Sequence, residues 1–329
     1  MMKILFYSDR PYEQPFLIRS NKAGHDIHFT TESLSSQNTS MASGFDAVSV
    51  FTGDDCSAAL LQELHSQGVQ YLVTRSAGVD HIDIDAAKKL GIRVANVPAY
   101  SPHAIAEHGI AMMLALTRKL ILADNQVHQQ DFRLDNLVGF NLHHKTVGLI
   151  GTGKIGAITA KILHGFGCQL LAYDIHPDES LTEKYGVVFT TLAELCAAAD
   201  IISLHTPLNP STKYLVNDAL ISTMKDGVMI INTARGAVVN TTAIIHGLTT
   251  GKIGFYGMDV YEKEKGVFFY DHGGEDLHDV QLEQLLSMNN VLLTPHQAFA
   301  TTEALGSIAQ SCFQHFDAWD RGQQAQFEL

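Results

Sequence analysis

One segment constrains the fold of this chain more than any other, the G-x-G-x-x-G motif Gly151-Thr152-Gly153-Lys154-Ile155-Gly156. It directly follows the apolar run 146–150 and opens a stretch of helical character over 154–166. In such a strand–turn–helix unit the glycines permit a tight turn, close backbone approach and close helix packing, and the helix N-terminus faces a pyrophosphate. The motif therefore predicts a dinucleotide-binding α/β unit.

An acidic residue stands where such a unit needs one. The apolar run 169–173 ends in Asp174, 18 residues after Gly156, where a carboxylate accepts hydrogen bonds from a ribose 2′-hydroxyl. The residues that follow, Ile175-His176-Pro177, offer no Arg or Lys for a 2′-phosphate, which favours NAD over NADP. The alternative is a glycine-rich turn in an ordinary α/β domain with a solvated carboxylate; the agreement of strand, motif, helix and acid in spacing disfavours it.

Short apolar runs typical of strands recur along the whole chain with helical stretches between them. They are 3–7, 47–51, 71–74, 94–97, 146–150, 170–173, 201–204, 228–232, 255–260 and 291–293. Most lack strict alternation, which suits parallel strands buried on both faces, so the fold class is α/β with two doubly wound parallel sheets. A (β/α)8 barrel is the competitor. Ten runs instead of eight, split into four and six by one long predicted helix over 102–129, disfavour it.

Further helices are predicted at 58–67, at 84–90 before Gly91, and at 301–321 before Gly322. With 46% hydrophobic and 17% charged residues the chain can form hydrophobic cores.

The net charge excludes some classes of partner. The 22 Lys and Arg residues against 35 Asp and Glu give a net charge of −13, which argues against nucleic acid or an anionic membrane as the main partner.

The sequence predicts a cytoplasmic protein. The N-terminal segment 1–10 reaches a charge after only a few apolar residues, too soon for the apolar region of a signal peptide. The longest apolar run, 110–116, is far shorter than the roughly 20 residues of a membrane-spanning helix. The four cysteines form no C-x-x-C pair, so we expect reduced packing residues.

Three later predicted strands are followed by side chains that could bind a substrate or transfer a proton. Arg235 follows the run 228–232, and a guanidinium at the carboxyl edge of a sheet suits a carboxylate substrate, although a surface ion pair is an equal alternative for this residue alone. The run 255–260 leads to acids, and the run 291–293 leads to His296. If these ends converge, a carboxylate can fix the tautomer of the imidazole and favour its protonated form, as a proton donor to a carbonyl requires. Which acid does so stays open.

The remaining histidines suggest a metal site only weakly. His103 and His108 resemble a zinc H-x-x-E-H motif with one residue too many, which puts them about 140° apart on a helix, so we expect no metal. His143, His144 and the histidines of 272–278 are expected in solvated loops. The segment His205-Thr206-Pro207 follows the run 201–204 and should line the cofactor cleft.

Taken together, the segments 151–156 with Asp174, 232–236, 259–264 and 295–296 resemble the D-isomer-specific 2-hydroxyacid dehydrogenases over nearly the whole chain. The resemblance implies a catalytic triad of Arg235, Glu264 and His296. It also implies a split, flavodoxin-like substrate domain of residues 1–100 and 299–329, with a Rossmann coenzyme domain of residues 101–298 inserted.

The same resemblance, with the motif, gives the binding sites. The cofactor, NAD, is expected at Gly151, Gly153, Lys154, Ile155, Gly156, Asp174, His205, Thr206, Pro207, Thr233, Ala234 and Asp259. The substrate is expected at Ala77, Gly78, Tyr100, Arg235, His296 and Phe299.

Within the family, the segments 75–80, 97–100, 265–271 and 296–299 resemble the fermentative branch that reduces pyruvate to D-lactate; His81 departs from it, since relatives often carry asparagine there. The expected reaction is reversible hydride transfer between NADH and C2 of pyruvate. Arg235 would bind the carboxylate and polarise the keto oxygen, and His296, oriented by Glu264, would deliver the proton. Backbone amides of Ala77 and Gly78 would grip the carboxylate, and Tyr100 and Phe299 would narrow the pocket. A homo-oligomer is expected.

Two alternatives remain. One is a related dehydrogenase for larger 2-keto acids; the other is a non-enzymatic NAD-sensing protein like the carboxy-terminal-binding corepressors, because fold does not guarantee chemistry. Within the enzymes, the lack of a further regulatory domain disfavours a phosphoglycerate dehydrogenase. Glu264 disfavours a formate dehydrogenase, whose branch uses glutamine there.

Overall fold

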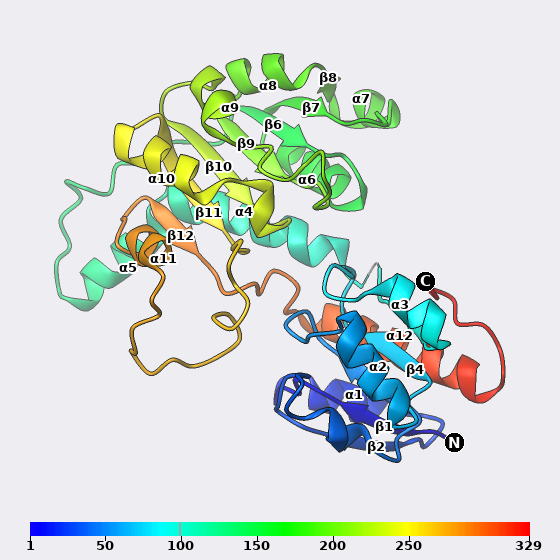
Figure 1. Cartoon of the computed structure of the whole chain (residues 1–329). Coiled ribbons are helices and arrows are strands. Elements are labelled where there is room, and N and C mark those ends of the chain that lie inside the picture. Colours follow the sequence, from blue (N-terminus) through cyan, green and yellow to red (C-terminus); the bar gives the residue numbers. More distant parts are fainter. Residues whose placement is uncertain (99) are drawn as a thin grey trace. The chain divides into compact units, whose positions relative to one another are not determined.

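The computed structural model describes residues 1–98 and 100–329, so that Ala99, within the segment 97–100, lies outside the described residues. The chain divides into two compact units (Figure 1). Unit 1 consists of Met1–Ser101 together with Ala300–Leu329, and unit 2 is Pro102–Phe299. The predicted domain boundaries, at 100 and 298, lie one residue before these.

Unit 1 is built on a parallel sheet whose order is β2-β1-β3-β4-β5 among its described residues. The strands are β1 Lys3–Phe6, β2 Asp26–Phe29, β3 Ala47–Val50, β4 Tyr71–Thr74 and β5 Arg93–Ala95. The helices are α1 Gln14–Ser20, the 3-10 helix η1 Thr39–Ala42, α2 Ala58–Ser66, α3 Ile84–Leu90 and α12 Thr302–Asp320. Leu61, Leu64 and Ala87 of α2 and α3 pack on one face. On the other face Phe313 and Phe316 of α12 meet Phe6 of β1.

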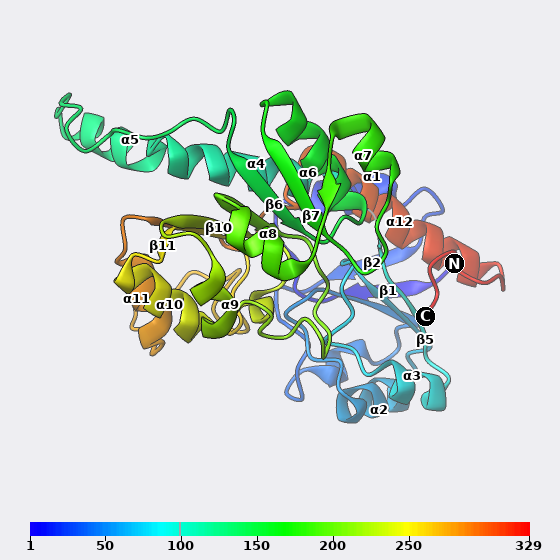
Figure 2. The same ribbon diagram turned by 90° about the horizontal axis from the view of Figure 1, so that it is seen from above.

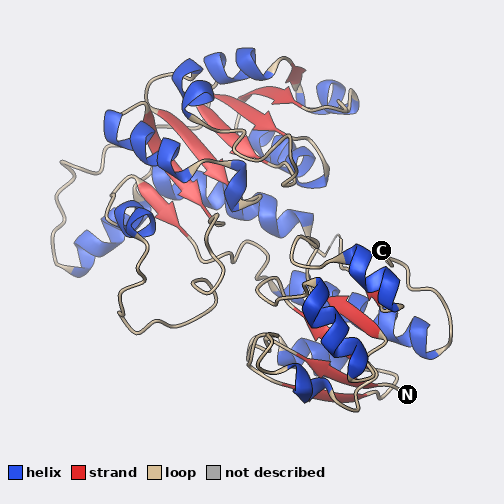
Figure 3. Ribbon diagram, viewed as in Figure 1, coloured by secondary structure: helices blue, strands red, loops and turns tan. Residues whose placement is uncertain are grey.

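Unit 2 carries a parallel sheet of order β12-β11-β10-β9-β6-β7-β8 (Figures 1 and 3). The strands are β6 Thr146–Ile150, β7 Gln169–Tyr173, β8 Val188–Phe189, β9 Ile201–Leu204, β10 Val228–Asn232, β11 Ile253–Met258 and β12 Val291–Leu293. The helices are α4 Pro102–Thr117, α5 Leu120–His128, α6 Lys154–Gly165, α7 Ser180–Tyr185, α8 Leu192–Ala198, α9 Asp218–Thr223, η2 Gly236–Val238 (3-10), α10 Thr241–Thr250 and α11 Val280–Leu286.

Two separate cores cover the faces of this second sheet. Residues of α4, α6 and α7, such as Met113, Leu163 and Leu181, pack on one face. Residues of α8, α9, α10 and α11, such as Leu195 and Ile244, pack on the other. The chain runs outward from β6 through β7 to β8, then returns to β9 and runs to β12 in the opposite direction. The strand order therefore reverses between β6 and β9, and ligands of open α/β sheets bind at the carboxyl ends of strands at such a point.

All ten predicted strand runs correspond to strands, and the α/β class with two parallel sheets is confirmed. The prediction missed β2 and β8, so that, among the described residues, the sheets contain five and seven strands instead of four and six. Both missed strands lie at sheet edges. The residues of β2 alternate between exposed and half-buried, and β8 has only two residues, so neither shows the continuous apolar run of a central strand.

The long helix predicted over 102–129 is also wrong, because it is interrupted between α4 and α5. Lys119 adopts a left-handed backbone conformation with φ of 51°. The carbonyl oxygen of Thr117 accepts a hydrogen bond from the backbone N–H of Phe140 at 3.2 Å. The Nζ of Lys119 donates to the carbonyl of Asn136 at 2.7 Å. The N–H of Phe140 thus takes the Thr117 carbonyl that a continuous helix would use internally, and α4 ends there.

The cysteines carry free thiols: Cys56, Cys196 and Cys312 are buried and Cys168 is half-buried. Among residues 1–98 and 100–329, no cluster of His, Cys, Asp and Glu side chains has the make-up of a metal site. No helix in the same described ranges has the length and hydropathy to cross a membrane.

Candidate active site

The glycine-rich turn joins β6 to α6 at the reversal of strand order. Gly151 has φ of 97°, and a Cβ there would lie 2.7 Å from the carbonyl oxygen of His205. At Gly156 a Cβ would collide with the carbonyl oxygen of Gly151. Gly153 is the N-cap residue of α6, and a side chain there would point into open space within the described structure. The first and third glycines are thus required by packing, and the second leaves the helix N-terminus accessible.

Asp174 follows β7 and closes over this turn. Its Oδ2 accepts hydrogen bonds from the backbone N–H of Thr152 at 2.6 Å and from the Thr152 hydroxyl at 2.9 Å. Its Oδ1 accepts from the N–H of His176 at 2.9 Å. Burial raises the pKa of Asp174, but these hydrogen bonds outweigh it and lower the pKa below its usual value. The carboxylate is therefore ionised at neutral pH and keeps lone pairs for a ribose hydroxyl.

Two unpartnered hydroxyl groups test whether the residues at these strand ends fit a dinucleotide. The Oγ1 atoms of Thr206, after β9, and Thr233, after β10, are buried without a hydrogen-bond partner in the described part of the chain. Buried polar groups are almost always hydrogen-bonded, so these hydroxyls fit a polar ligand. Burial lowers the pKa of His205 to about 4, and this neutral imidazole lies 3.0 Å from the Ser203 hydroxyl. The residues present therefore fit NAD.

Arg235 stands in a loop shaped by Asn232, the last residue of β10. The Asn232 side chain donates to the carbonyl of Arg235 at 3.0 Å and accepts from the N–H of Ala234 at 3.1 Å. The Nη1 of Arg235 donates to the Ala234 carbonyl at 2.7 Å. At Gly236 a Cβ would overlap the backbone between Tyr261 and Glu262. This glycine lets the Arg235 loop lie directly against the segment that follows β11.

That segment brings an acid to His296. The Nδ1 of His296 lies 2.8 Å from Oε1 of Glu264, and the other carboxylate oxygen accepts from the N–H of Tyr261 at 3.1 Å. The side chains of His296 and Glu264 are 19% and 26% exposed, so the pair is accessible to a small molecule. Of the acids that the sequence left open, Glu264 is the one in contact with the imidazole. Glu262 instead hydrogen-bonds Tyr214, which raises the pKa of that phenol.

Asp259, the remaining candidate acid after β11, lies beneath the turn that carries His296. It is buried, and its Oδ1 accepts from the Thr294 hydroxyl at 2.6 Å and from the N–H of Gln297 at 2.8 Å. Its Oδ2 accepts from the N–H of Ala298 at 2.9 Å. Asp259, which is also expected at the cofactor, organises the turn that carries His296 through these contacts. Sequence reasoning missed Thr294, whose position at the end of β12 beside Pro295 and His296 was its only signal.

The other expected substrate residues divide between the units. Ala77, Gly78 and Tyr100 belong to unit 1, and Phe299, which is buried, belongs to unit 2. The carbonyl of Ala77 accepts from the Asn96 side chain at 2.8 Å. The carbonyl of Gly78 accepts from the Ser76 hydroxyl at 2.7 Å. With both carbonyls engaged, the peptide planes of this loop are fixed.

His81, the departure from the family pattern, lies 3.4 Å from the Thr74 hydroxyl. As expected for solvated loops, His143, His144 and His278 are exposed, whereas His272 is half-buried and contacts the Val267 carbonyl at 2.8 Å.

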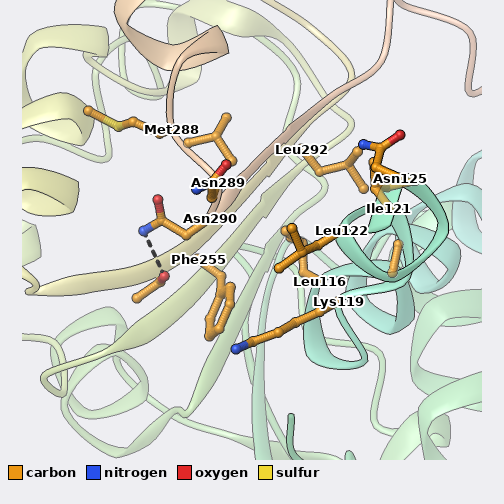
Figure 4. A pocket seen from close by; sticks show the side chains of 13 residues that line it. Leu116, Lys119, Ile121, Leu122, Asn125, Phe255, Met288, Asn289, Asn290 and Leu292 are labelled. Carbon is orange, nitrogen blue, oxygen red and sulfur yellow. Dashed lines mark hydrogen bonds between the residues drawn. The ribbon is translucent and has the colours of Figure 1, made fainter. Parts of the chain in front are cut away.

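A cavity of about 470 Å³ lies at the opposite edge of the same sheet. Figure 4 shows the side chains that line it. Gly254 and Phe255, at the start of β11, and Val291, at the start of β12, line it together with Leu116 and Ile121 from the helical side. Strand starts lie at the amino edge, whereas the residues described above follow strand ends. This cavity is therefore separate from the candidate active site.

Comparison with known proteins identifies relatives along the whole chain. The sequence model of the D-isomer specific 2-hydroxyacid dehydrogenase NAD binding domain matches residues 110–298. The D-lactate dehydrogenase of Escherichia coli (strain K12) is 42% identical over 329 residues, which cover 100% of both proteins.

Solved structures of similar proteins also match nearly the whole chain. The pyruvate reductase of Chlamydomonas reinhardtii has a TM-score of 0.94 at 38% identity, covering 99% of this chain and 98% of that one. The D-lactate dehydrogenase of Aquifex aeolicus, complexed with NAD and lactic acid, has a TM-score of 0.86 at 35% identity, covering 97% of this chain and 96% of that one.

Proposed function

Because the chain belongs to the D-isomer-specific 2-hydroxyacid dehydrogenases, which are NAD-dependent oxidoreductases, we propose that it reduces pyruvate to D-lactate reversibly, in fermentation. The observation that carries this proposal is the contact of His296 with Glu264, next to the Arg235 loop. The names of the relatives, D-lactate dehydrogenase and pyruvate reductase, support the substrate.

The residues of unit 2 hold the coenzyme. Gly151 to Gly156 present the N-terminus of α6, including the backbone of Lys154 and Ile155, to the pyrophosphate, and Asp174 accepts from the adenosine ribose. The uncharged segment 205–207 lies beside the adenosine half of the coenzyme. Thr233 and Ala234, which precede Arg235, line the nicotinamide half. When bound, the coenzyme supplies the hydride for C2 in one direction and receives it in the other.

Arg235 binds the substrate carboxylate through its planar guanidinium, which offers two parallel hydrogen bonds. The same positive charge polarises the keto oxygen as negative charge develops there, which lowers the barrier to reduction. Fixing the substrate at two points also orients C2 relative to the coenzyme.

His296 and Glu264 manage the proton. Because Nδ1 of His296 faces the Glu264 carboxylate, its Nε2–H is the proton donor to the keto oxygen during reduction. The Glu264 carboxylate holds the imidazole ring in this orientation. In the oxidation of D-lactate, neutral Nε2 accepts the hydroxyl proton.

The proposal assigns a role to each unit and to the other expected substrate residues. Unit 1 acts as the substrate domain and provides the backbone amides of Ala77 and Gly78 for the carboxylate. Unit 2 acts as the coenzyme domain. Tyr100 and Phe299 narrow the space around the methyl group and favour pyruvate over larger 2-keto acids.

An initial-rate screen tests this proposal. NADH oxidation is measured with pyruvate, phenylpyruvate, branched 2-keto acids and hydroxypyruvate, with chiral analysis of the product. We expect pyruvate to have the highest kcat/KM and the product to be D-lactate. A higher value for a larger 2-keto acid would reassign the substrate, and NADH binding without turnover of any of them would indicate an NAD-sensing protein.

We also propose that the protein is a homo-oligomer. The helix α5 and the loop that follows it extend as an arm (Figure 2). This arm exposes large apolar side chains: Leu120 52%, Ile121 55%, Val127 46%, Phe132 72%, Leu134 71% and Val138 77%. An apolar surface of this kind is typical of a protein contact, and a second copy is its proposed occupant. Light scattering should give a multiple of 36.0 kDa, and a smaller mass for the F132S/L134S variant.

The four free thiols favour a reducing compartment, and we place the enzyme in the cytoplasm.

A further inference from the structure

His108 of α4 contacts the buried acid beneath the catalytic turn. Its Nε2 lies 2.9 Å from the Thr294 hydroxyl oxygen and 3.5 Å from Oδ1 of Asp259. The side chain of His108 is 18% exposed, and that of Asp259 is 1% exposed. The imidazole is thus the outermost member of a chain of contacts that ends at a buried carboxylate.

The chemistry of the groups fixes the direction of these hydrogen bonds. An ionised carboxylate only accepts, so the single hydrogen of the Thr294 hydroxyl goes to Asp259. The oxygen of Thr294 must then accept from His108, and its partner Nε2 must carry a hydrogen. Donation therefore runs from His108 through Thr294 to Asp259.

The acceptor of this chain holds the catalytic turn. Both oxygens of Asp259 accept backbone N–H groups of the residues directly after His296, namely Gln297 and Ala298. His296 itself has a left-handed backbone with φ of 55°, which is unfavourable for a residue with a Cβ and persists only where neighbouring contacts impose it. Asp259 supplies such contacts, because it holds the two residues that follow His296.

We propose that His108 is a positioning residue. By donating through Thr294, it fixes Asp259 as the acceptor of the turn 294–298, and so keeps His296 against Glu264. It does not touch the reacting atoms; it acts on catalysis through the backbone of His296. The catalytic part of this inference depends on the function proposed above, whereas the structural part does not.

Three variants test the inference. His108→Leu removes the donor at similar volume, and His108→Gln keeps an N–H donor on a side chain of similar reach. His103→Ala, at an exposed residue of the same helix, is the matched control. We expect His108→Leu to lower kcat for pyruvate reduction about tenfold and to move its alkaline limb to lower pH, because His296 leaves Glu264. His108→Gln should stay within about threefold of the wild type, and the KM for NADH should change less than twofold.

A double-mutant cycle separates positioning from general damage to the fold. Thr294→Val breaks the same chain, so the His108→Leu/Thr294→Val double variant should be no worse than the poorer single variant. Additive losses, wild-type behaviour of His108→Leu, or equal damage from Leu and Gln would overturn the inference.

An NMR titration of His296 provides a readout without turnover. Its midpoint should move to lower pH in His108→Leu and not in His103→Ala, even if the wild type reduces no 2-keto acid. An unmoved midpoint in His108→Leu would overturn the structural part directly. The absence of wild-type turnover with a moved midpoint would instead refute only the proposed function.

Discussion

The Arg75–Glu13 pair of unit 1 and the His296–Glu264 pair of unit 2 have almost the same length and opposite surroundings. Nε of Arg75 lies 2.9 Å from Glu13, with the side chains 0% and 4% exposed. Nδ1 of His296 lies 2.8 Å from Glu264, with the side chains 19% and 26% exposed. Arg75 also donates to the carbonyls of Tyr7 and Ser8 and to the Ser49 hydroxyl, and lies between the rings of Phe6 and Phe51.

The comparison shows that burial decides whether an ion pair stabilises the fold or takes part in proton transfer. A guanidinium whose three nitrogens all donate to protein atoms in a dry interior is fixed, and it ties together the strand ends of its sheet. A half-exposed imidazole with one carboxylate partner can exchange its proton with a substrate. Loss of a partner should therefore damage folding in unit 1 and chemistry in unit 2.

The largest effect is expected for Arg75→Met. It leaves Glu13 buried without its partner, and breaking a buried pair in this way costs about 3–5 kcal/mol of unfolding free energy. Urea denaturation measures the loss. The double variant Glu13→Gln/Arg75→Met should recover part of it, because no unpaired charge remains. A loss below about 1 kcal/mol in the single variant would show that the pair is not structural.

Arg235→Lys should leave stability nearly unchanged and reduce kcat/KM for pyruvate about 100-fold, because a point charge replaces a two-point anchor. Both KM for pyruvate and turnover should be affected, and the KM for NADH should change less than twofold. Wild-type kinetics with pyruvate would remove Arg235 from the substrate site.

Glu264→Gln tests the half-exposed pair through its charge. Glutamine keeps the shape and removes the charge that favours imidazolium, so the alkaline limb of pyruvate reduction should move to lower pH, and D-lactate oxidation should become active at lower pH. At the wild-type optimum for reduction we expect a loss of about tenfold.

His296→Gln is the control and should depress both directions over the whole pH range. A reduction limb that is unmoved or shifted to higher pH in Glu264→Gln would mean that another acid, Glu262 or Asp259, acts on the imidazole.

Asp174→Ala concerns the coenzyme end of unit 2. NADH should bind about tenfold more weakly and its advantage over NADPH should narrow, because the ribose loses an acceptor and a 2′-phosphate loses a repelling charge. Fluorescence titration with both coenzymes measures this. A wild type that already prefers NADPH would contradict the assignment.

The smallest effect is expected at Glu328 in unit 1. The hydrogen bonds from Arg93 lower the pKa of Glu328 to about 2 from an ordinary value of 4.5. A carboxyl with a lowered pKa adds stability above its unfolded value, and this contribution disappears as the pH falls from about 4.5 to about 2. Glu328→Gln should therefore cost less than about 1 kcal/mol of stability at pH 7, since the pair is partly exposed, and this cost should disappear below about pH 2. Thermal melts of the wild type and the variant across this pH range measure the difference in stability. A difference that does not change with pH would contradict the prediction.

The sequence by itself determined the central strands of both sheets and the dinucleotide-binding motif. Central strands such as β9 and β10 are buried on both faces, so each leaves a continuous apolar run that is readable locally. The glycine motif is equally readable in the sequence, because its three glycines lie within six residues. Edge strands such as β2 lack that burial, and the break at Lys119 depends on backbone returning from Phe140, so neither was visible in the sequence.

Only the tertiary structure decided which side chains meet. Asp259, Glu262 and Glu264 were equal candidates because each follows β11; a left-handed turn at His296, held by Asp259, directs the imidazole to Glu264. The contact of His108 with Thr294 joins residues 186 positions apart. Hydrogen bonds depend on distance and direction in space, and sequence spacing fixes these only within one helix, strand or turn.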